Sequence, residues 1–118
     1  KDLMSQVKEI KGLKVLIIQL ADLDAKSLRT VLDQYKDKLG SGVVVLGGGG
    51  EGKVALAAGV TKDLIARISA GDIVSRLAPL VGGGGGGRAD MAQAGGKDIE
   101  KLPEALKKAE TIIAELIK

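Results

Sequence analysis

The sequence predicts a small α/β domain in which helices cover a mixed β-sheet. Two continuous runs of β-branched and apolar residues, 14–20 and 43–46, are typical of strands buried on both faces, and the segments between and after them have helical periodicity. With 118 residues, 45% of them hydrophobic, the chain is long enough for one modest core. We therefore expect a single domain over residues 1–118 with the element order β-α-β-β-α-α-loop-α.

The first third of the chain predicts a β-α-β unit. Asp24 is suited to cap a helix and Gly40 to end it. The apolar residues between them have helical spacing: Leu28, Val31, Leu32, Tyr35 and Leu39. A helix between two buried strands predicts that the strands pair in parallel through a right-handed crossover.

Residues 47–52 are expected to turn the chain, so that residues 53–58 return as an antiparallel strand. Two nucleotide-binding patterns fall in this segment, but both are weak. Any glycine-rich hexamer satisfies G-x-G-x-x-G, and the P-loop pattern fails at Val54, where a hydroxyl must hold magnesium. Both motifs also need a long helix directly after the loop, and the next helix start is only at Thr61.

Three helices are expected in the second half. Thr61 begins a helix that Gly71 ends, and a second helix, capped by Asp72, continues to the glycine run that follows. The last covers residues 103–118 and begins with a proline, which suits a first helical position.

The most informative segment is the glycine-rich stretch at residues 82–96, which we interpret as a contact loop. Without Cβ atoms its backbone can be approached closely, and successive N–H groups can surround an oxygen anion. A flexible linker is the alternative. The chemical diversity of Arg88, Asp90, Met91 and Gln93 argues against it, because linkers are repetitive.

Composition excludes several function classes. The chain has no cysteine and no histidine, so thiol chemistry, disulfides, Ser-His catalysis and zinc sites built on these residues are excluded within it. Tyr35 is the only aromatic residue, so RNA would be bound through backbone, phosphate and groove contacts rather than base stacking. The net charge of +3 is mildly favourable for a polyanion. No apolar run approaches a membrane span, and a start at Lys1 suggests a piece of a longer chain.

The run Gly-Gly-Gly-Gly-Gly-Gly-Arg-Ala-Asp-Met-Ala-Gln-Ala-Gly-Gly at residues 82–96 resembles the C-terminal signature of bacterial alanyl-tRNA synthetases, the DHHA1-type domain. Other segments resemble that domain in order and spacing: 13–20, 28–29, 39–41, 43–46, 51–54 and 58–63. The resemblance therefore covers nearly the whole chain.

This resemblance implies a tRNA-binding module that does no chemistry itself. Such a domain is expected to hold the outer corner of the tRNA and to help bring the aminoacylation and editing centres onto one substrate. The implied partners are alanine-specific tRNA and the other domains of a cytoplasmic parent synthetase. A homo-oligomer stays open, and no membrane is expected. No cofactor is expected in this segment, whereas the parent would use ATP, magnesium and an editing-domain zinc.

The sequence departs from the family pattern at two positions. The family usually has lysine at the position of Gly84 and proline at the position of Ala89. Loss of the lysine leaves Arg88 as the only charged donor that the glycine run can offer to phosphate, so we expect a lower affinity than the family implies.

The candidate nucleic-acid-binding residues are those of the glycine run and four cations elsewhere: Gly82, Gly83, Gly84, Gly85, Gly86, Gly87, Arg88, Asp90, Met91, Gln93, Gly95, Gly96, Lys53, Lys62, Arg67 and Arg76. Each side chain has a structural alternative. Arg88 is suited to bind phosphate or to brace the loop through Asp90, and Gln93 to donate to a ribose or base edge or to brace the backbone. Met91 is suited to pack in the core or loop, or to contact exposed tRNA bases. The four cations, taken singly, are ordinary solvated side chains.

Two other functions stay open. The domain also resembles the accessory domain of DHH-type phosphoesterases, which would require a catalytic domain containing Asp-His-His upstream. An oligomerisation module is the second alternative, in which an apolar stripe of the last helix pairs with another copy: Leu106, Ile112, Ile113, Leu116 and Ile117.

Overall fold

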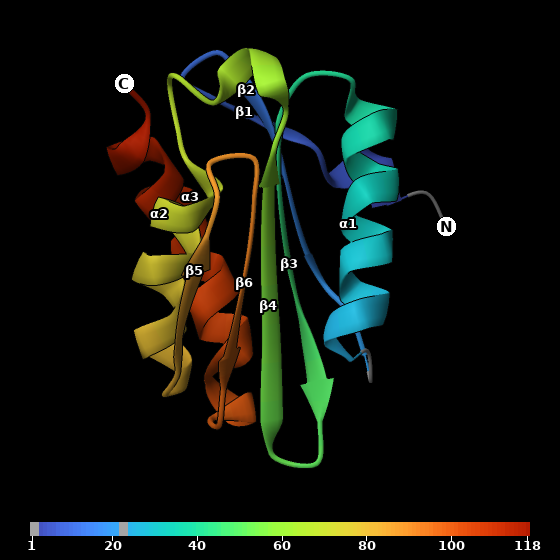
Figure 1. Cartoon of the computed structure of the whole chain (residues 1–118), viewed down its shortest axis with the longest axis vertical. Coiled ribbons are helices and arrows are strands. Elements are labelled where there is room, and N and C mark those ends of the chain that lie inside the picture. Colours follow the sequence, from blue (N-terminus) through green and yellow to red (C-terminus); the bar gives the residue numbers. More distant parts are fainter. Residues whose placement is uncertain (1–2, 22–23) are drawn as a thin grey trace.

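The computed structural model describes residues 3–21 and 24–118. The strands are β1 (Lys8–Ile10), β2 (Leu13–Gln19), β3 (Val43–Gly50), β4 (Lys53–Val60), β5 (Gly84–Gly87) and β6 (Met91–Gly96). The α-helices are α1 (Ala25–Leu39), α2 (Ala70–Leu77) and α3 (Leu102–Leu116). The six strands form one mixed sheet in the order β1-β2-β3-β4-β6-β5. Helix α1 covers one face, and α2 and α3 cover the other (Figure 1). The predicted fold class is confirmed.

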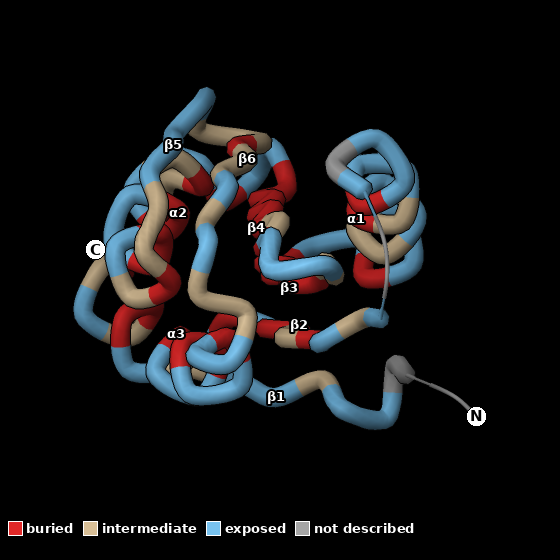
Figure 2. The backbone as a smooth tube through the Cα atoms, turned by 90° about the horizontal axis from the view of Figure 1, so that it is seen from below, coloured by how far each residue is buried: buried red, intermediate tan, exposed pale blue. Residues whose placement is uncertain are grey.

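Two apolar cores lie on the two faces of the sheet. The larger core joins α2 and α3 to the sheet, and the smaller one lies beneath α1. Successive residues of β3 alternate between them: Val43 and Val45 enter the larger core, Val44 and Leu46 the smaller. Figure 2 shows this burial along β3 and β4 and on the inward sides of the helices. Burial on both faces explains why this strand is continuously apolar.

The predicted β-α-β unit is present. Strands β2 and β3 pair in parallel, with Leu16 opposite Val44. The Asp24 carboxylate accepts a hydrogen bond from the Ser27 N–H at 2.8 Å at the start of α1. Gly40 ends the helix with a φ of 75°, a conformation that favours glycine.

The short edge strand β1 was not predicted. It pairs antiparallel with the first residues of β2 through a turn at Lys11 and Gly12, whose φ values are 51° and 85°. Two positive φ values in a two-residue hairpin turn match the right-handed twist of the strands. A strand of three residues is too short to show an alternating pattern, so Gly12 was the only sequence signal for a turn after this strand.

The expected turn over residues 47–52 is wrong for its first four residues. Strand β3 continues to Gly50, and only Glu51 and Gly52 turn the chain into β4, which is antiparallel as predicted. The glycines are held in the ladder by β4. A Cβ at Gly47 would lie 2.8 Å from a methyl carbon of Leu102, so the glycine also lets the start of α3 approach the sheet.

The helix expected from Thr61 to Gly71 is also wrong. The structure has a 3-10 helix at Lys62–Leu64, and Gly71 lies inside α2. The Thr61 hydroxyl caps no helix, because it accepts from the Gly42 N–H at 2.9 Å and donates to Asp63.

The helix predicted next, with Asp72 as its cap, is shifted and split. Helix α2 already begins at Ala70, which places Asp72 in its first turn, and residues Ala78–Val81 form a separate 3-10 helix. Pro79 lies in this 3-10 helix. Because proline has no N–H, it cannot donate the hydrogen bond that would continue α2 as an α-helix. The last helix, by contrast, is present within one or two residues of its predicted ends.

Asp63 is expected to make stability depend on acid pH. Ser41 and Thr61 donate hydrogen bonds to its carboxylate at 2.5 and 2.6 Å, and they hold the pKa of Asp63 below its ordinary value of 3.8. Such a group adds stability above its unfolded pKa and loses it as the pH falls through the folded pKa. We expect Asp63→Asn to lower the melting temperature at pH 7 and the deficit to shrink below pH 3.8. A constant deficit would contradict this, and Asp33→Asn on the exposed side of α1 is the control.

Candidate nucleic-acid interface

The glycine-rich segment is a β-hairpin, so its prediction as a loop is wrong. Strands β5 and β6 pair antiparallel, with Gly84 opposite Gly95 and Gly87 opposite Ala92, and β6 also pairs with β4. All four residues of β5 are exposed at the edge of the sheet. The ladder supplies the hydrogen bonds that order a backbone without side chains. The segment therefore presents an ordered and exposed stretch of peptide backbone, which we call the glycine ribbon.

The glycines of this ribbon fall into two groups. A Cβ added at Gly83, Gly85 or Gly87 would approach backbone atoms of β6 to 2.7 Å or less. A Cβ at Gly84 would meet nothing within 4 Å, and at Gly86 the nearest atom, a side-chain oxygen of α2, is 3.7 Å away. Close pairing with β6 therefore requires glycine at positions 83, 85 and 87. At Gly84 and Gly86, by contrast, the described residues leave room for a side chain.

The tip of the hairpin, residues 88–90, is held by the start of α2. The Gly71 N–H donates to the Arg88 carbonyl at 3.1 Å, and the Ala70 N–H donates to the Ala89 carbonyl at 2.8 Å. A Cβ at Gly71 would lie 2.8 Å from the Gly87 carbonyl oxygen, so the helix reaches the hairpin only because this residue is glycine. The first N–H groups of α2 thus find partners in the hairpin tip.

Asp90 joins the tip to the rest of the sheet and to Arg88. Its carbonyl accepts the Val60 N–H at 3.0 Å, and its carboxylate lies 3.3 Å from the Arg88 Nε. The Arg88 side chain is nevertheless 70% exposed. The predicted bracing pair is present, and it leaves most of the Arg88 side chain exposed. A surface pair of this kind contributes at most about 1 kcal/mol.

The remaining residues of the glycine run spread along β6 and beyond it. Met91 is partly buried and packs against the smaller core, as the packing alternative predicted. Gln93 is half-buried in mid-strand and takes part in an interaction within the chain. Gly96 is at the far end of β6, six residues and thus about 20 Å from Asp90 of the tip at about 3.3 Å per residue. Gly82, with a φ of 71°, lies at that far end too, before β5 begins, and Gly95 is opposite Ala55. The signature therefore extends over both ends of the hairpin.

The four predicted cations do not form one patch with Arg88. Lys62 follows the end of β4 that adjoins the tip, but Lys53 begins β4 at the opposite end. The Arg67 Nε donates to the Lys118 carbonyl at 3.1 Å, and Arg76 forms an ion pair at 2.6 Å with Glu115 of α3. Arg67 and Arg76 thus have structural partners on the α3 side, and their contact with nucleic acid stays a prediction.

Sequence reasoning missed Lys36. This residue of α1 reaches across the sheet, and its Nζ donates to the Asp90 carbonyl at 3.2 Å. The side chain is half-buried. Helix periodicity places this position beside the apolar stripe, four residues after Leu32 and three before Leu39, but a lysine there ordinarily extends its ammonium group into solvent. Residues 36 and 90 are far apart in sequence, so no local pattern joins them.

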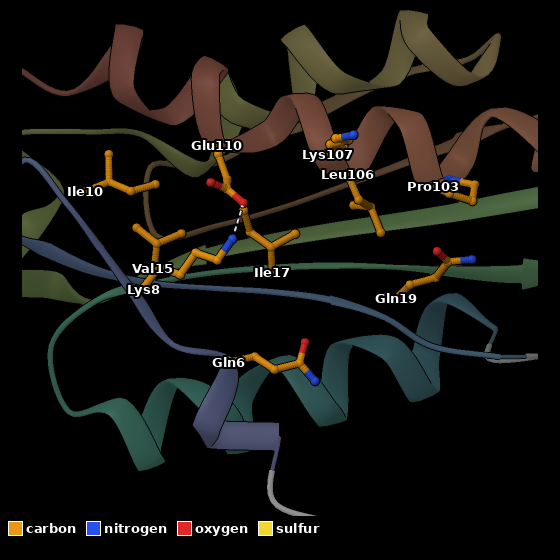
Figure 3. Close-up of a pocket in the computed structure, with 10 residues that line it drawn as sticks. All are labelled: Gln6, Lys8, Ile10, Val15, Ile17, Gln19, Pro103, Leu106, Lys107 and Glu110. Carbon is orange, nitrogen blue, oxygen red and sulfur yellow. Dashed lines mark hydrogen bonds and ion pairs between the residues drawn. The ribbon is translucent and has the colours of Figure 1, made fainter.

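A separate groove of about 340 Å³ lies between β2 and α3. Figure 3 shows its apolar floor, with Val15, Ile17 and Leu106, and the ion pair at 2.6 Å between Lys8 and Glu110 that crosses it. It adjoins the β1-β2 edge of the sheet, whereas the hairpin forms the opposite edge. None of the predicted binding residues lines it.

The apolar stripe of the last helix belongs to the domain's own core. Leu106, Ile112, Ile113 and Ile117 are at most 9% exposed and pack against the sheet and α2, and Leu116 is partly buried beside them. The oligomerisation hypothesis built on this stripe is therefore wrong. Across residues 3–21 and 24–118, no cluster of acidic side chains is placed to hold a metal ion. The helices described there are too short or too polar to cross a membrane.

Residues 12–115 match the DHHA1 domain family. Alanine–tRNA ligase of Pelotomaculum thermopropionicum is 52% identical over 119 residues and matches 100% of this chain. The enzyme of Chromohalobacter salexigens is 56% identical over 105 residues, which are 89% of this chain. The chain spans only 14% and 12% of the lengths of these two relatives.

Solved structures agree with this match. The crystal structure of the C-Ala domain from Aquifex aeolicus alanyl-tRNA synthetase superimposes with a TM-score of 0.84 at 27% identity, covering 92% of this chain and 97% of that one. A DHH-domain structure described as a member of the s1p family of ribosomal proteins gives a TM-score of 0.63 at 17% identity, covering 98% of this chain and 29% of that one. The second likeness concerns the fold alone.

Proposed function

Because this chain belongs to the DHHA1 domain family and corresponds to the C-terminal domain of alanyl-tRNA synthetases, we propose that it binds tRNA for such an enzyme. In this role it holds the outer corner of the tRNA and helps couple aminoacylation to editing. The tRNA is alanine-specific, and the parent is a cytoplasmic ligase that uses ATP, magnesium and an editing-domain zinc in its other domains.

The observation that carries the proposal is the hairpin tip. Its three carbonyls are bonded to α1, α2 and β4, so the backbone that presents Arg88 is fixed, while the guanidinium itself is largely exposed. An arginine held in this way binds a phosphate with little loss of conformational freedom. Leading to it, the four residues of β5 are exposed and carry no side chains of their own.

The composition is consistent with recognition by shape. Tyr35, the single aromatic residue, is partly buried against the smaller core, and the Lys38 Nζ lies 5.6 Å from its ring centre. Base stacking therefore has no platform in this chain, and phosphate and ribose contacts along the outside of folded RNA remain. The DHH-type alternative has no support beyond the fold, and the sequence upstream of this domain would decide it.

The proposal is tested by measuring the affinity of the chain for tRNA and for a plain RNA duplex of equal length across a salt series. We expect a preference for tRNA that survives moderate salt. Equal binding that collapses as salt rises would reduce the interaction to non-specific counterion release and overturn the proposal.

Arg88→Gln is expected to lower the affinity for tRNA about tenfold and to reduce the salt slope by about one, because one phosphate contact is lost. The melting temperature should change little, since the exposed pair with Asp90 is weak. Arg29→Gln is the matched control, because it removes the same charge from an exposed position on α1. An unchanged affinity in Arg88→Gln would remove Arg88 from the interface.

Gly84→Lys is expected to raise the affinity for tRNA several-fold and to steepen the salt slope by about one, because it places a cation on β5, the strand that leads to Arg88. The substitution fits the fold, since a Cβ at this position meets nothing within 4 Å. Gly84→Ala is the control for the loss of glycine. If Gly84→Lys and Gly84→Ala bind tRNA equally at every salt concentration, β5 does not lie near RNA phosphates.

A further inference from the structure

Lys36 is placed unusually for a lysine on a surface helix. Its ammonium group bonds the carbonyl of Asp90, 54 positions along the chain, instead of extending into solvent from α1. A half-buried ammonium loses part of its hydration, and a neutral carbonyl replaces only part of that loss. Among the described residues no carboxylate forms an ion pair with it.

The backbone of β4 makes room for this side chain. Gly59 is buried beneath it, and a Cβ at Gly59 would lie 2.6 Å from the Lys36 Cδ and 3.2 Å from its Cγ. Since Gly59 has no positive φ, its glycine is explained by the lysine stem that crosses it. The absence of a side chain at Gly59 therefore lets the Lys36 stem cross β4 and bring its ammonium group to the hairpin tip.

Lys36 and Arg88 approach Asp90 through different atoms. Lys36 bonds the main-chain oxygen, which the Val60 N–H also uses, and Arg88 lies against the carboxylate. An ammonium has three N–H donors, and Asp90 engages one of them. A guanidinium has five, and the Nε contact with Asp90 engages one. Two cations with unused donors thus flank one residue of the tip.

We propose that Lys36 is a second phosphate-binding residue, and that it forms with Arg88 a two-cation site for the RNA backbone at the hairpin tip. This inference rests on the proposed tRNA-binding function and adds a residue outside the glycine-rich signature. The Asp90 carboxylate lies 3.3 Å from the Arg88 Nε and is partly neutralised by it. A phosphate that binds both cations gives the Lys36 ammonium charge-assisted hydrogen bonds in place of the water that it has lost.

The site is tested with wild type, Lys36→Met, Arg88→Gln and the double variant, each titrated with tRNA across a salt series. Methionine keeps an apolar stem over Gly59 while removing the charge. We expect each single substitution to reduce the salt slope by about one and the double variant to reduce it by about two. Lys38→Met is the matched control, because it removes a lysine from the same helix that lies over Tyr35 instead of the tip.

Gly59→Ala gives a second measurement in which the charge is retained. The added Cβ displaces the flexible Lys36 stem, so we expect a several-fold loss of affinity in the wild-type background and no further loss in Lys36→Met. Circular dichroism verifies that each variant is folded.

The outcomes separate the two proposals. If wild type shows no preference for tRNA over duplex, the proposed function fails. If wild type prefers tRNA but Lys36→Met keeps the full salt slope, the two-cation site is wrong while the function stands. If the double variant loses no more slope than Arg88→Gln alone, Lys36 only holds the tip in place, and its assignment as a phosphate ligand is overturned.

Discussion

Gly83→Ala is expected to destabilise the chain by about 3 kcal/mol, the upper part of the range for overpacking. An added Cβ would overlap the Gly95 carbonyl oxygen and lie 2.6 Å from the Gly96 Cα. These are backbone atoms of β6, so no side-chain rotation relieves the clash. The Gly83 N–H also donates to the Ala78 carbonyl at 3.0 Å, and any shift of the chain sacrifices that hydrogen bond.

Urea denaturation measures this effect, and Gly84→Ala is its control. The neighbouring position has open space for a Cβ, so Gly84→Ala should stay within about 0.5 kcal/mol of wild type. The difference between two adjacent glycines distinguishes a paired strand from a mobile loop, because a loop would accept alanine equally well at both. Equal stability of the two variants would mean that β5 is not paired with β6 in solution.

Ile73→Ala is expected to cost about 3 kcal/mol, within the range for a large aliphatic side chain removed from a core. Ile73 is fully buried in α2 and belongs to the larger core between the helices and the sheet. The loss combines the transfer of the apolar group with the cavity left behind. Since the start of α2 holds the hairpin tip, we also expect the amide protons of residues 88–91 to exchange faster with solvent.

Ile65→Ala provides the comparison for this prediction. Ile65 is 40% exposed, and its truncation should change the free energy of unfolding by less than about 0.5 kcal/mol. A similar loss in both isoleucine variants would contradict the placement of α2 against the sheet.

Much of the fold could be predicted wherever the local pattern and the tertiary environment agree. Strands β2 and β3 are apolar on both faces because both faces are covered, and α1 has an acidic cap, a regular stripe and a glycine stop. The last helix also has a regular apolar stripe, and a proline near its first position marks its start. In these segments the polarity of each side chain matches its burial, so hydrophobic periodicity is sufficient to predict the secondary structure.

The glycine segments are where prediction from sequence failed. Glycine has no side chain and therefore no periodicity, and its weak strand propensity favours a loop. Residues 47–50 and 84–87 became strands because neighbouring strands supply their hydrogen bonds. That pairing is a long-range property, which a local reading of composition does not contain.

The sequence by itself determined the α/β class, the resemblance to the alanyl-tRNA synthetase C-terminal domain and the absence of cysteine and histidine chemistry, and it singled out Arg88 as a candidate phosphate ligand. Only the tertiary structure decided that the signature is a hairpin, that the fold requires glycine at Gly83 but has room for a side chain at Gly84, and that Lys36 reaches Asp90 over Gly59. The physical reason is that composition and periodicity describe neighbours along the chain. The candidate site is built from backbone contacts and side chains brought together across the sheet.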